Sequence, residues 1–482
     1  MTQFHPSVNH LDDSTIDDLR MSVGVTMAGG GRLVNPFHSW TEILESRLSV
    51  LCQVNALLFT ISRLAGFQRV QYESTGGVSI LNHYGAIFAP SGTGKDHTVD
   101  KLEEMFARPL HAVKEAKELL WLAKVNEEED ENPDAKPREI RESLKYKGFA
   151  PMAGLISHGT PEGLREKRRI ASKYKSGGVD VRSSEMGASL NEGSGYTSFL
   201  SVLIEAYGGT HYDKAIKGDE NPTSCSGVPT TFLGLSSLSP FKDKKTLKDW
   251  NRLLGTGLAR RAFVSVSESH TPTPASNADL LRRFAHAQDR EAPIEALKAK
   301  AMKVYETLKE GSKLIRLTVD AKIALALIEE WVAAHTTGND ALDASYYSIP
   351  DKAARLACWS AVLNGKTHVT SADIMLCLPM AIAFHQAFEK SMQAMAGGDV
   401  EPVEKVADTI VKHFEQAPEG MPVQQFKKTF GLHKDMPITK LCEVVEEMSE
   451  TLDGLALAVF EVPSNGGRPK KVVRLLPSSD LL

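Results

Sequence analysis

The stretch from His83 to Lys101, HYGAIFAPSGTGKDHTVDK, constrains the fold more than any other part of the chain. The apolar run 86–89 predicts a buried strand, and the cluster 90–94, rich in Pro, Ser and Gly, predicts a sharp turn. An amphipathic helix is expected to begin near Lys95. Glycines let backbone N–H groups point into such a turn, and a helix N-terminus adds partial positive charge. The stretch therefore predicts an α/β fold with a loop suited to a polyphosphate.

The loop matches the Walker A pattern except at two positions, where Ala89 replaces Gly and Asp96 replaces Ser or Thr. Asp96 is the candidate metal ligand, because Mg²⁺ accepts carboxylate oxygen, and the hydroxyl of Thr98 is the alternative. The expected ligands are ATP and Mg²⁺. The predicted nucleotide-binding residues are Pro90, Ser91, Gly92, Thr93, Gly94, Lys95, Asp96 and His97. An ordinary glycine-rich turn before a helix is the competing interpretation.

Length and charge narrow the classes of protein. A chain of 482 residues predicts two to three domains. The net charge of −5 provides no general attraction to nucleic acid, so any such contact must come from local basic patches. The five cysteines show neither metal-ligand spacing nor the density of a secreted domain, so we expect a cytoplasmic protein. The apolar window 48–67 is interrupted by polar residues and predicts a core helix, so no membrane association is expected.

Two further strands carry candidate catalytic residues. The segment 177–190 predicts a strand, expected beside the strand before the loop, that ends at Glu185, which would orient an attacking water. Ser184 stands where a metal-holding Asp is expected, and Asp180 would lie about 17 Å back along an extended strand. A surface glutamate is the alternative. The segment 227–235 predicts a central strand, followed by two candidate γ-phosphate sensors, Ser236 and Ser237.

Six motifs occur in the order found in a known family: APSGTGKD, TPEGLRE, SSEMGASL, EAYGGTHYDKAIKG, TFLGLSSLSP and GTGLARRAF. Over residues 75–270 they resemble phage and prophage P-loop ATPases, which are related to hexameric superfamily-three and AAA+-like replicative helicases and are often fused to primases. The resemblance implies that Lys95 and Asp96 bind nucleotide and metal. It also implies an arginine finger, Arg261 or alternatively Arg260, that reaches into the neighbouring subunit of a homo-oligomeric ring, most often a hexamer.

The same resemblance suggests DNA contacts. Segment 211–225 corresponds in position to a channel hairpin in which Lys214 and Lys217 would grip single-stranded or forked DNA. A surface turn carrying lysines is the competing interpretation. The helix that begins at Thr160-Pro161 is basic, and a hydrated surface competes there with a nucleic-acid or subunit contact.

The C-terminal third predicts two more parts. Residues 271–396 resemble the helical lid of ring ATPases, with Arg355 as a candidate second sensor. After a linker at 397–402, residues 403–477 have the pattern of a winged helix, whose wing would contact DNA through Arg468, Lys470 and Lys471. A packing or partner-binding module is the alternative.

The expected architecture is an α/β P-loop NTPase core of the AAA+/RecA-like type with flanking helical parts. Its predicted segments are an N-terminal helical segment 1–70, the core 71–270, the lid 271–396 and the winged-helix domain 403–477. The expected function is an ATP-hydrolysing ring motor on DNA, a helicase or translocase with a primase or polymerase partner. The first 70 residues are too few for a primase domain. A nucleotide-dependent loader or switch, and a degenerate ATPase kept as a scaffold, are the alternatives.

Overall fold

The computed structural model describes residues 13–30, 33–44, 46–74, 76–146, 155–157, 159–172, 177–192, 194–209, 227–267, 291–310, 313–334, 339–395, 420–423, 425–426, 455–462 and 470–477. The chain forms two compact units, Met1–Ala396 and Gly397–Leu482, which we describe separately. The predicted N-terminal segment, core and lid therefore share one unit, and the unit boundary falls at the start of the predicted linker.

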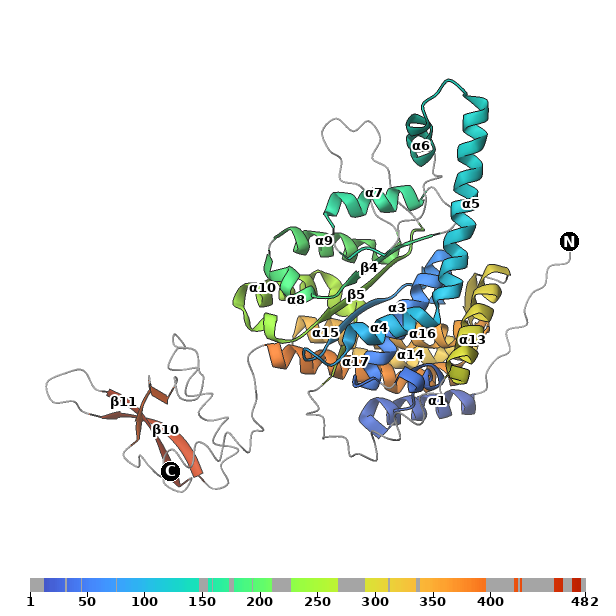
Figure 1. Ribbon diagram of the computed structural model, residues 1–482. Coiled ribbons are helices and arrows are strands. Elements are labelled where there is room, and N and C mark those ends of the chain that lie inside the picture. Colours follow the sequence, from blue (N-terminus) through green and yellow to red (C-terminus); the bar gives the residue numbers. More distant parts are fainter. Residues whose placement is uncertain are drawn as a thin grey trace. The chain divides into compact units, whose positions relative to one another are not determined.

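A four-stranded parallel sheet forms the centre of the first unit (Figure 1). Its strands are β3 (Tyr84–Phe88), β4 (Val179–Ser183), β5 (Thr230–Ser236) and β6 (Phe263–Val266), in the order β4-β5-β3-β6. The predicted α/β class is confirmed. β5 is central, as expected, and all of its residues are buried. The strand before Glu185 was expected beside the strand before the loop, but β5 lies between them, because this fully buried strand pairs with both neighbours.

The strand order makes the connections after β3 and β5 run in opposite directions across the sheet. All four strands run parallel, so their carboxyl ends share that edge. From β3 the chain passes across β5 to reach β4, and from β5 it passes back across β3 to reach β6. In open parallel sheets, ligands bind outside the carboxyl ends of strands at the point where such connections diverge. The turn after β3 lies at this point.

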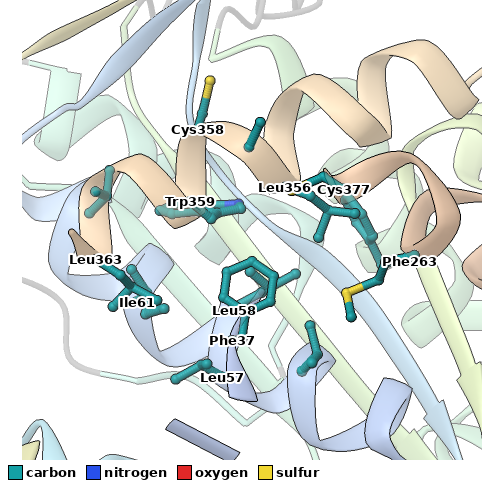
Figure 2. Packing of buried hydrophobic residues seen from close by; sticks show 14 of the residues in the cluster. Phe37, Leu57, Leu58, Ile61, Phe263, Leu356, Cys358, Trp359, Leu363 and Cys377 are labelled. Carbon is teal, nitrogen blue, oxygen red and sulfur yellow. The ribbon is translucent and has the colours of Figure 1, made fainter. Parts of the chain in front are cut away.

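Helices cover both faces of the sheet. One face packs against α3 (Val50–Phe67), α4 (Lys95–Met105), α16 (Ile349–Leu363) and α17 (Ser371–Met395). The other face packs against α7 (Pro161–Ser172), α8 (Met186–Glu192), α9 (Ser194–Glu205) and α10 (Lys244–Leu253). Figure 2 shows the first core, in which Leu57 and Leu58 of α3, Trp359 of α16 and Phe263 of β6 converge.

α3 is the most apolar of these helices, and its position explains why polar residues interrupt it. The side chain of Asn55 is fully buried and donates hydrogen bonds to the backbone oxygens of Ala86 and Phe263, which ties the helix to two strands. By length and composition, both α3 and α17 could cross a membrane. In this fold α3 is a core helix, since 78% of its apolar window is buried, whereas the value for α17 is 50%.

A second sheet has the order β2-β1-β7-β8. Its strands are β1 (Gln71–Ser74), β2 (Gly77–Ile80), β7 (Leu314–Leu317) and β8 (His368–Val369). β1 and β2 pair antiparallel and form a hairpin. Thr370 and Asp373 cap α17, because the backbone N–H of Thr370 donates to Asp373 and that of Asp373 donates to Thr370.

The acidic run at 126–131 forms the end of α5 (Ala107–Glu131). Glutamate is a good helix former, and Lys124 pairs with Glu127 one turn later, so the run extends the helix. α6 (Pro137–Tyr146) packs back on α5 through Val125, Ile140 and Leu144.

The remaining elements of the first unit connect or flank these layers. They are α1 (Asp13–Val25), η1 (Thr26–Gly30), α2 (His38–Thr41), η2 (Glu42–Leu44), η3 (Ala206–Gly208), η4 (Ser239–Lys242), η5 (Leu254–Leu258), α11 (Ala259–Arg261), α13 (Glu291–Glu310), α14 (Val319–Ala333) and α15 (Asp340–Tyr346).

In the second unit, β9 (Met421–Pro422), β10 (Leu455–Val462) and β11 (Lys470–Pro477) form an antiparallel sheet of order β10-β11-β9. β10 and β11 pair from Leu455–Pro477 to Val462–Lys470, as the predicted hairpin requires. The helices expected at 403–451 fall almost entirely outside the described residues.

Candidate functional site

The turn after β3 has the backbone geometry that its sequence predicts. Gly92 and Gly94 have φ angles of 81° and 80°, values that side-chain-bearing residues rarely adopt. The hydroxyl of Thr93 donates to the carbonyl oxygen of Pro90 at 2.8 Å, which closes the turn. Lys95 is the first residue of α4, and it is buried, with 7% of its surface exposed. The helix N-terminus, the two glycines and this lysine together form a cradle for an anion.

Strand contacts hold both ends of the turn. The backbone N–H of Ala89, the residue after β3, donates to the carbonyl oxygen of Ser236 at 2.9 Å. This hydrogen bond fixes the start of the loop to the end of β5. In the first turn of α4, the Thr98 hydroxyl contacts the Gly94 carbonyl oxygen at 3.0 Å and the Ser46 hydroxyl at 2.6 Å. The hydroxyl of Thr98, the alternative metal ligand, is therefore engaged in contacts that hold α4 in place. The side chain of His97 is exposed beside the loop.

Glu185 lies in the turn between β4 and α8, where its side chain is exposed, as is that of Ser184. A close contact two residues later holds this turn against β5. The backbone N–H of Gly187 donates to the Ser236 hydroxyl at 3.2 Å, and a Cβ at position 187 would lie only 2.6 Å from that oxygen. The Glu185 turn and the glycine loop therefore meet the end of β5 at the same residue.

The two candidate sensors have different surroundings. Ser236 is fully buried, and its hydroxyl accepts from Gly187 and donates to the carbonyl oxygen of Ser237. The Ser236 hydroxyl therefore makes its hydrogen bonds to other residues of the protein. Ser237 is partly exposed at the carboxyl edge, and its hydroxyl lies 2.9 Å from that of Ser239. Of the two, Ser237 has the geometry to meet a ligand.

An ion-pair network that the sequence did not reveal borders the loop. Arg182 of β4 lies with Nη2 3.0 Å from Oδ1 of Asp96 and Nη1 2.7 Å from Oδ1 of Asp100, and Glu103 follows at 3.8 Å. Burial works against the charge of Arg182, but the hydrogen bonds to Asp100 and Asp96 raise its pKa. The sequence contained one signal of this network, the spacing of its acidic residues, because Asp96, Asp100 and Glu103 share one face of a helix.

Arg63 of α3 extends the same network. Its Nη1 lies 2.8 Å from Glu103, and its Nε lies 3.7 Å from Oδ2 of the buried Asp180. Burial raises the pKa of Asp180, and Arg63 partly opposes that shift. Asp180 is thus a buried residue near the amino end of β4, away from the carboxyl edge.

The donor groups here do not fit a metal ion bound directly by Asp96. Oδ1 of that carboxylate is already paired with the Arg182 guanidinium. Within the described part of the chain, no group of three or more His, Cys, Asp or Glu side chains has an arrangement that could hold a metal. The expected role of Asp96 as metal ligand is not supported by this geometry.

Arg260 and Arg261 end α11, immediately before β6, and so lie at the amino edge of the sheet, opposite the loop. Nη1 of Arg261 lies 3.4 Å from the carbonyl oxygen of Gly257, and its guanidinium lies 5.5 Å from the centroid of the Tyr207 ring. Arg260 is exposed. Neither arginine can reach the loop of its own chain, and Arg260 is the better placed to reach another.

Arg355 also lies away from the loop. It is 4% exposed, its Nε donates to Asp351 at 2.8 Å, and its Nη1 donates to the carbonyl oxygen of Asn82 at 3.0 Å. Asn82 precedes β3, so the loop is roughly 20 Å away along the strand. Burial opposes the charge of Arg355, but Asp351 raises its pKa. The predicted sensor role of Arg355 is not supported, because its charge is matched within the fold.

The candidate DNA contacts are largely outside the described residues. Lys214 and Lys217 fall between Gly209 and Val228, whose backbone groups hydrogen bond at 3.2 Å, and Arg468 is likewise outside. Lys470 and Lys471 begin β11.

In the basic helix α7, two of the cations serve the fold. Arg168 is buried and donates to the carbonyl oxygen of Gly209 at 3.1 Å, and Arg169 pairs with Glu166 at 2.8 Å. Arg168 therefore fits neither a hydrated surface nor a nucleic-acid contact, and the charge of Arg169 is paired within the helix.

No protein-family model and no curated protein matches this chain.

Proposed function

We propose that the chain binds ATP at residues 90–97 and hydrolyses it, with the central sheet acting as a P-loop NTPase core of the AAA+/RecA-like type. One observation carries the proposal. Two glycines at φ near 80° lie directly before a lysine at a helix N-terminus, at the carboxyl edge of a parallel sheet where the connections diverge. Backbone N–H groups and a lysine in this arrangement suit a triphosphate.

The other residues take roles that follow from their positions. Lys95 balances charge on the β- and γ-phosphates, the exposed Glu185 orients a water, and Ser237 contacts the γ-phosphate. Each of these groups is at the carboxyl edge of the sheet. The missing part is a cation at the transferring phosphoryl group, since a guanidinium there stabilises the transition state.

We propose that a second copy of the chain supplies this cation through Arg260 or Arg261. Both lie at the amino edge of the sheet, so among the described residues neither of these arginines completes the site of its own chain. Supplying the arginine in trans couples hydrolysis to movement between subunits, which supports a homo-oligomeric ring motor on single-stranded or forked DNA. The resemblance to phage replicative ATPases supports the same function, as it does a winged-helix domain at 403–477 and the DNA contacts of Lys214, Lys217, Arg468, Lys470 and Lys471.

ATP turnover tests the proposal. Lys95→Ala should lower turnover by about 10²-fold or more, as loss of one positioned charge donor does in other enzymes. Lys309→Ala, an exposed lysine in the last turn of α13, is the matched control and should leave turnover unchanged. Single-stranded DNA should stimulate the wild-type protein, and a tailed duplex should be unwound. Equal turnover by Lys95→Ala and wild type would refute the ATPase.

A second candidate is a nucleotide-dependent switch that binds a replication partner without unwinding DNA. The observations that favour it are the pairing of Asp96 with Arg182 and the presence of Ser184 where an acidic residue would hold metal. Both predict slow hydrolysis. Lys95-dependent nucleotide binding with no strand displacement would support this candidate over the motor.

A further inference from the structure

The charge balance around the first turns of α4 is unusual for a loop that receives phosphate groups. Asp96, Asp100 and Glu103 lie on one face of the helix, within 3.0, 2.7 and 3.8 Å of the Arg182 guanidinium. Arg182 also donates from Nη2 to the backbone oxygen of Asp96 at 3.5 Å. Arg182, a residue of β4, therefore contacts carboxylates on two successive turns of α4, the helix that follows the loop.

The pairing is buried on the side of the arginine. The side chain of Arg182 is 12% exposed, whereas those of Asp96 and Asp100 are 43% and 60% exposed, so water is excluded from the guanidinium more than from the carboxylates. Breaking such a pair leaves a buried charge uncompensated, which costs far more than breaking an exposed pair. A divalent cation that bound Oδ1 of Asp96 would have to displace Arg182.

A second consequence concerns the phosphates. Asp96 follows Lys95 directly, and an uncompensated carboxylate at that position would repel a bound polyphosphate. The guanidinium of Arg182, which Asp96 shares with Asp100 and Glu103, reduces that repulsion without a metal ion, and it also ties the first turn of α4 to β4.

We propose that Arg182 is a positioning residue that neutralises Asp96 in place of a metal ion, so that nucleotide binding to this loop depends only weakly on Mg²⁺. The inference rests on the proposed nucleotide site. Any Mg²⁺ that takes part would then arrive on the phosphates of ATP and not through Asp96.

The test is a fluorescence titration with a mant-labelled ATP, in Mg²⁺ and in EDTA, on the full chain. For the wild type we expect the two dissociation constants to differ by less than about threefold. Arg182→Gln leaves Asp96 and Asp100 uncompensated, so its affinity in EDTA should fall by about tenfold or more and recover in Mg²⁺. The double variant Arg182→Gln/Asp96→Asn should regain most of the affinity in EDTA, because the repelling charge is gone.

Two further variants protect the test against misfolding. Asp96→Asn alone removes the charge that Arg182 neutralises, and it should bind as well in EDTA as in Mg²⁺. Arg138→Gln is the matched control, because Arg138 pairs with Glu142 on the exposed surface of α6, and it should behave as wild type. Circular dichroism identifies any variant that fails to fold. If Arg182→Gln is such a variant, the wild-type dissociation constants in Mg²⁺ and in EDTA decide the matter.

The inference is overturned if wild-type affinity falls tenfold or more in EDTA and Asp96→Asn removes that dependence, since Asp96 would then be the metal ligand. Failure of the proposed function has a different signature. In that case the wild type and Lys95→Ala would bind the labelled nucleotide equally, or neither would bind it.

Discussion

The backbone N–H of Gly187 donates a hydrogen bond to the side-chain hydroxyl of Ser236 at 3.2 Å. The carbonyl oxygen of the same serine accepts from Ala89, at the start of the glycine loop. Ser236 therefore joins the Glu185 turn to the loop, although the three segments are far apart in the sequence. This buried serine sets the relative position of the groups that we propose act on ATP.

Replacing that serine should loosen the site. Ser236→Ala leaves the buried N–H of Gly187 without its acceptor, which should lower the free energy of unfolding by about 1–3 kcal/mol. Ser237→Ala is the matched control, because Ser237 is partly exposed, and its free energy of unfolding should stay within about 0.5 kcal/mol of wild type. Urea denaturation measures both. Equal effects of the two variants would show that the Ser236 hydroxyl does not join the turns.

Close packing at Gly187 leads to a separate prediction. A Cβ there would lie 2.6 Å from the Ser236 hydroxyl and 2.9 Å from both Phe241 and Pro240. Gly187→Ala should therefore lower the free energy of unfolding by about 1–3 kcal/mol, as overpacking does. Gly195→Ala is the control, since a Cβ at that helical position meets nothing within 4 Å and should be neutral or slightly stabilising. A stable Gly187→Ala protein would contradict this packing.

Local signals in the sequence predicted the local structure of the site. The apolar run before the loop, the two glycines and the periodic helix after it are all contained within residues 83–105, and the structure has each of them. The strand order could not be predicted in the same way, because it depends on which distant strands pair. The expectation that the Glu185 strand adjoins β3 was wrong for this reason.

The partners of long charged side chains could not be predicted from the sequence either. Arg355 was expected at a γ-phosphate, yet helix packing turns it toward Asn82 at the other edge of the sheet. Arg182 lies in a short strand of mostly buried residues, and only the packing of α4 shows which carboxylates it pairs with.

Tyr207 contacts two arginines at the amino edge. Its ring centroid lies 4.6 Å from the guanidinium carbon of Arg355 and 5.5 Å from that of Arg261. Tyr207→Leu removes the aromatic face from both, so the free energy of unfolding should fall by about 2–4 kcal/mol. Tyr207→Phe keeps the ring and should cost no more than about 1 kcal/mol. Equal losses for the two variants, measured by urea denaturation, would exclude the ring as the source of stability.

The two arginines before β6 can be separated by mixing subunits. Because Arg260 is exposed, Arg260→Ala should preserve stability, but it should lower ATP turnover by about 10³-fold if that side chain completes a neighbour's site. Mixing this variant with Lys95→Ala should restore part of the turnover, because an intact loop then meets an intact arginine. Arg261→Ala tests the alternative in the same assay. Wild-type turnover by both arginine variants would rule out a contribution in trans from this segment.

The lowered pKa of the buried Lys352 should make the free energy of unfolding depend on pH. Burial lowers its pKa to about 7 from 10.5, although Asp351 opposes the shift, and its Nζ donates to the Ser345 hydroxyl at 3.4 Å. The nearby His385 does not titrate in this range, since burial lowers its pKa to about 4. Between pH 7 and 10.5 the unfolded chain therefore holds a proton that the folded chain has released. The free energy of unfolding should rise with pH across that window, by up to about 1.4 kcal/mol per pH unit from this group.

Lys352→Met keeps the apolar stem of the side chain and removes the titrating amine. The difference in unfolding free energy between variant and wild type should therefore favour the variant most near pH 7 and shrink as the pH rises. Urea denaturation at pH 7.5 and 9.5 measures this difference, and other titrating groups cancel because both proteins contain them. A difference that does not change with pH would mean that Lys352 remains charged inside the fold, with the Ser345 hydroxyl and Asp351 compensating for the loss of water.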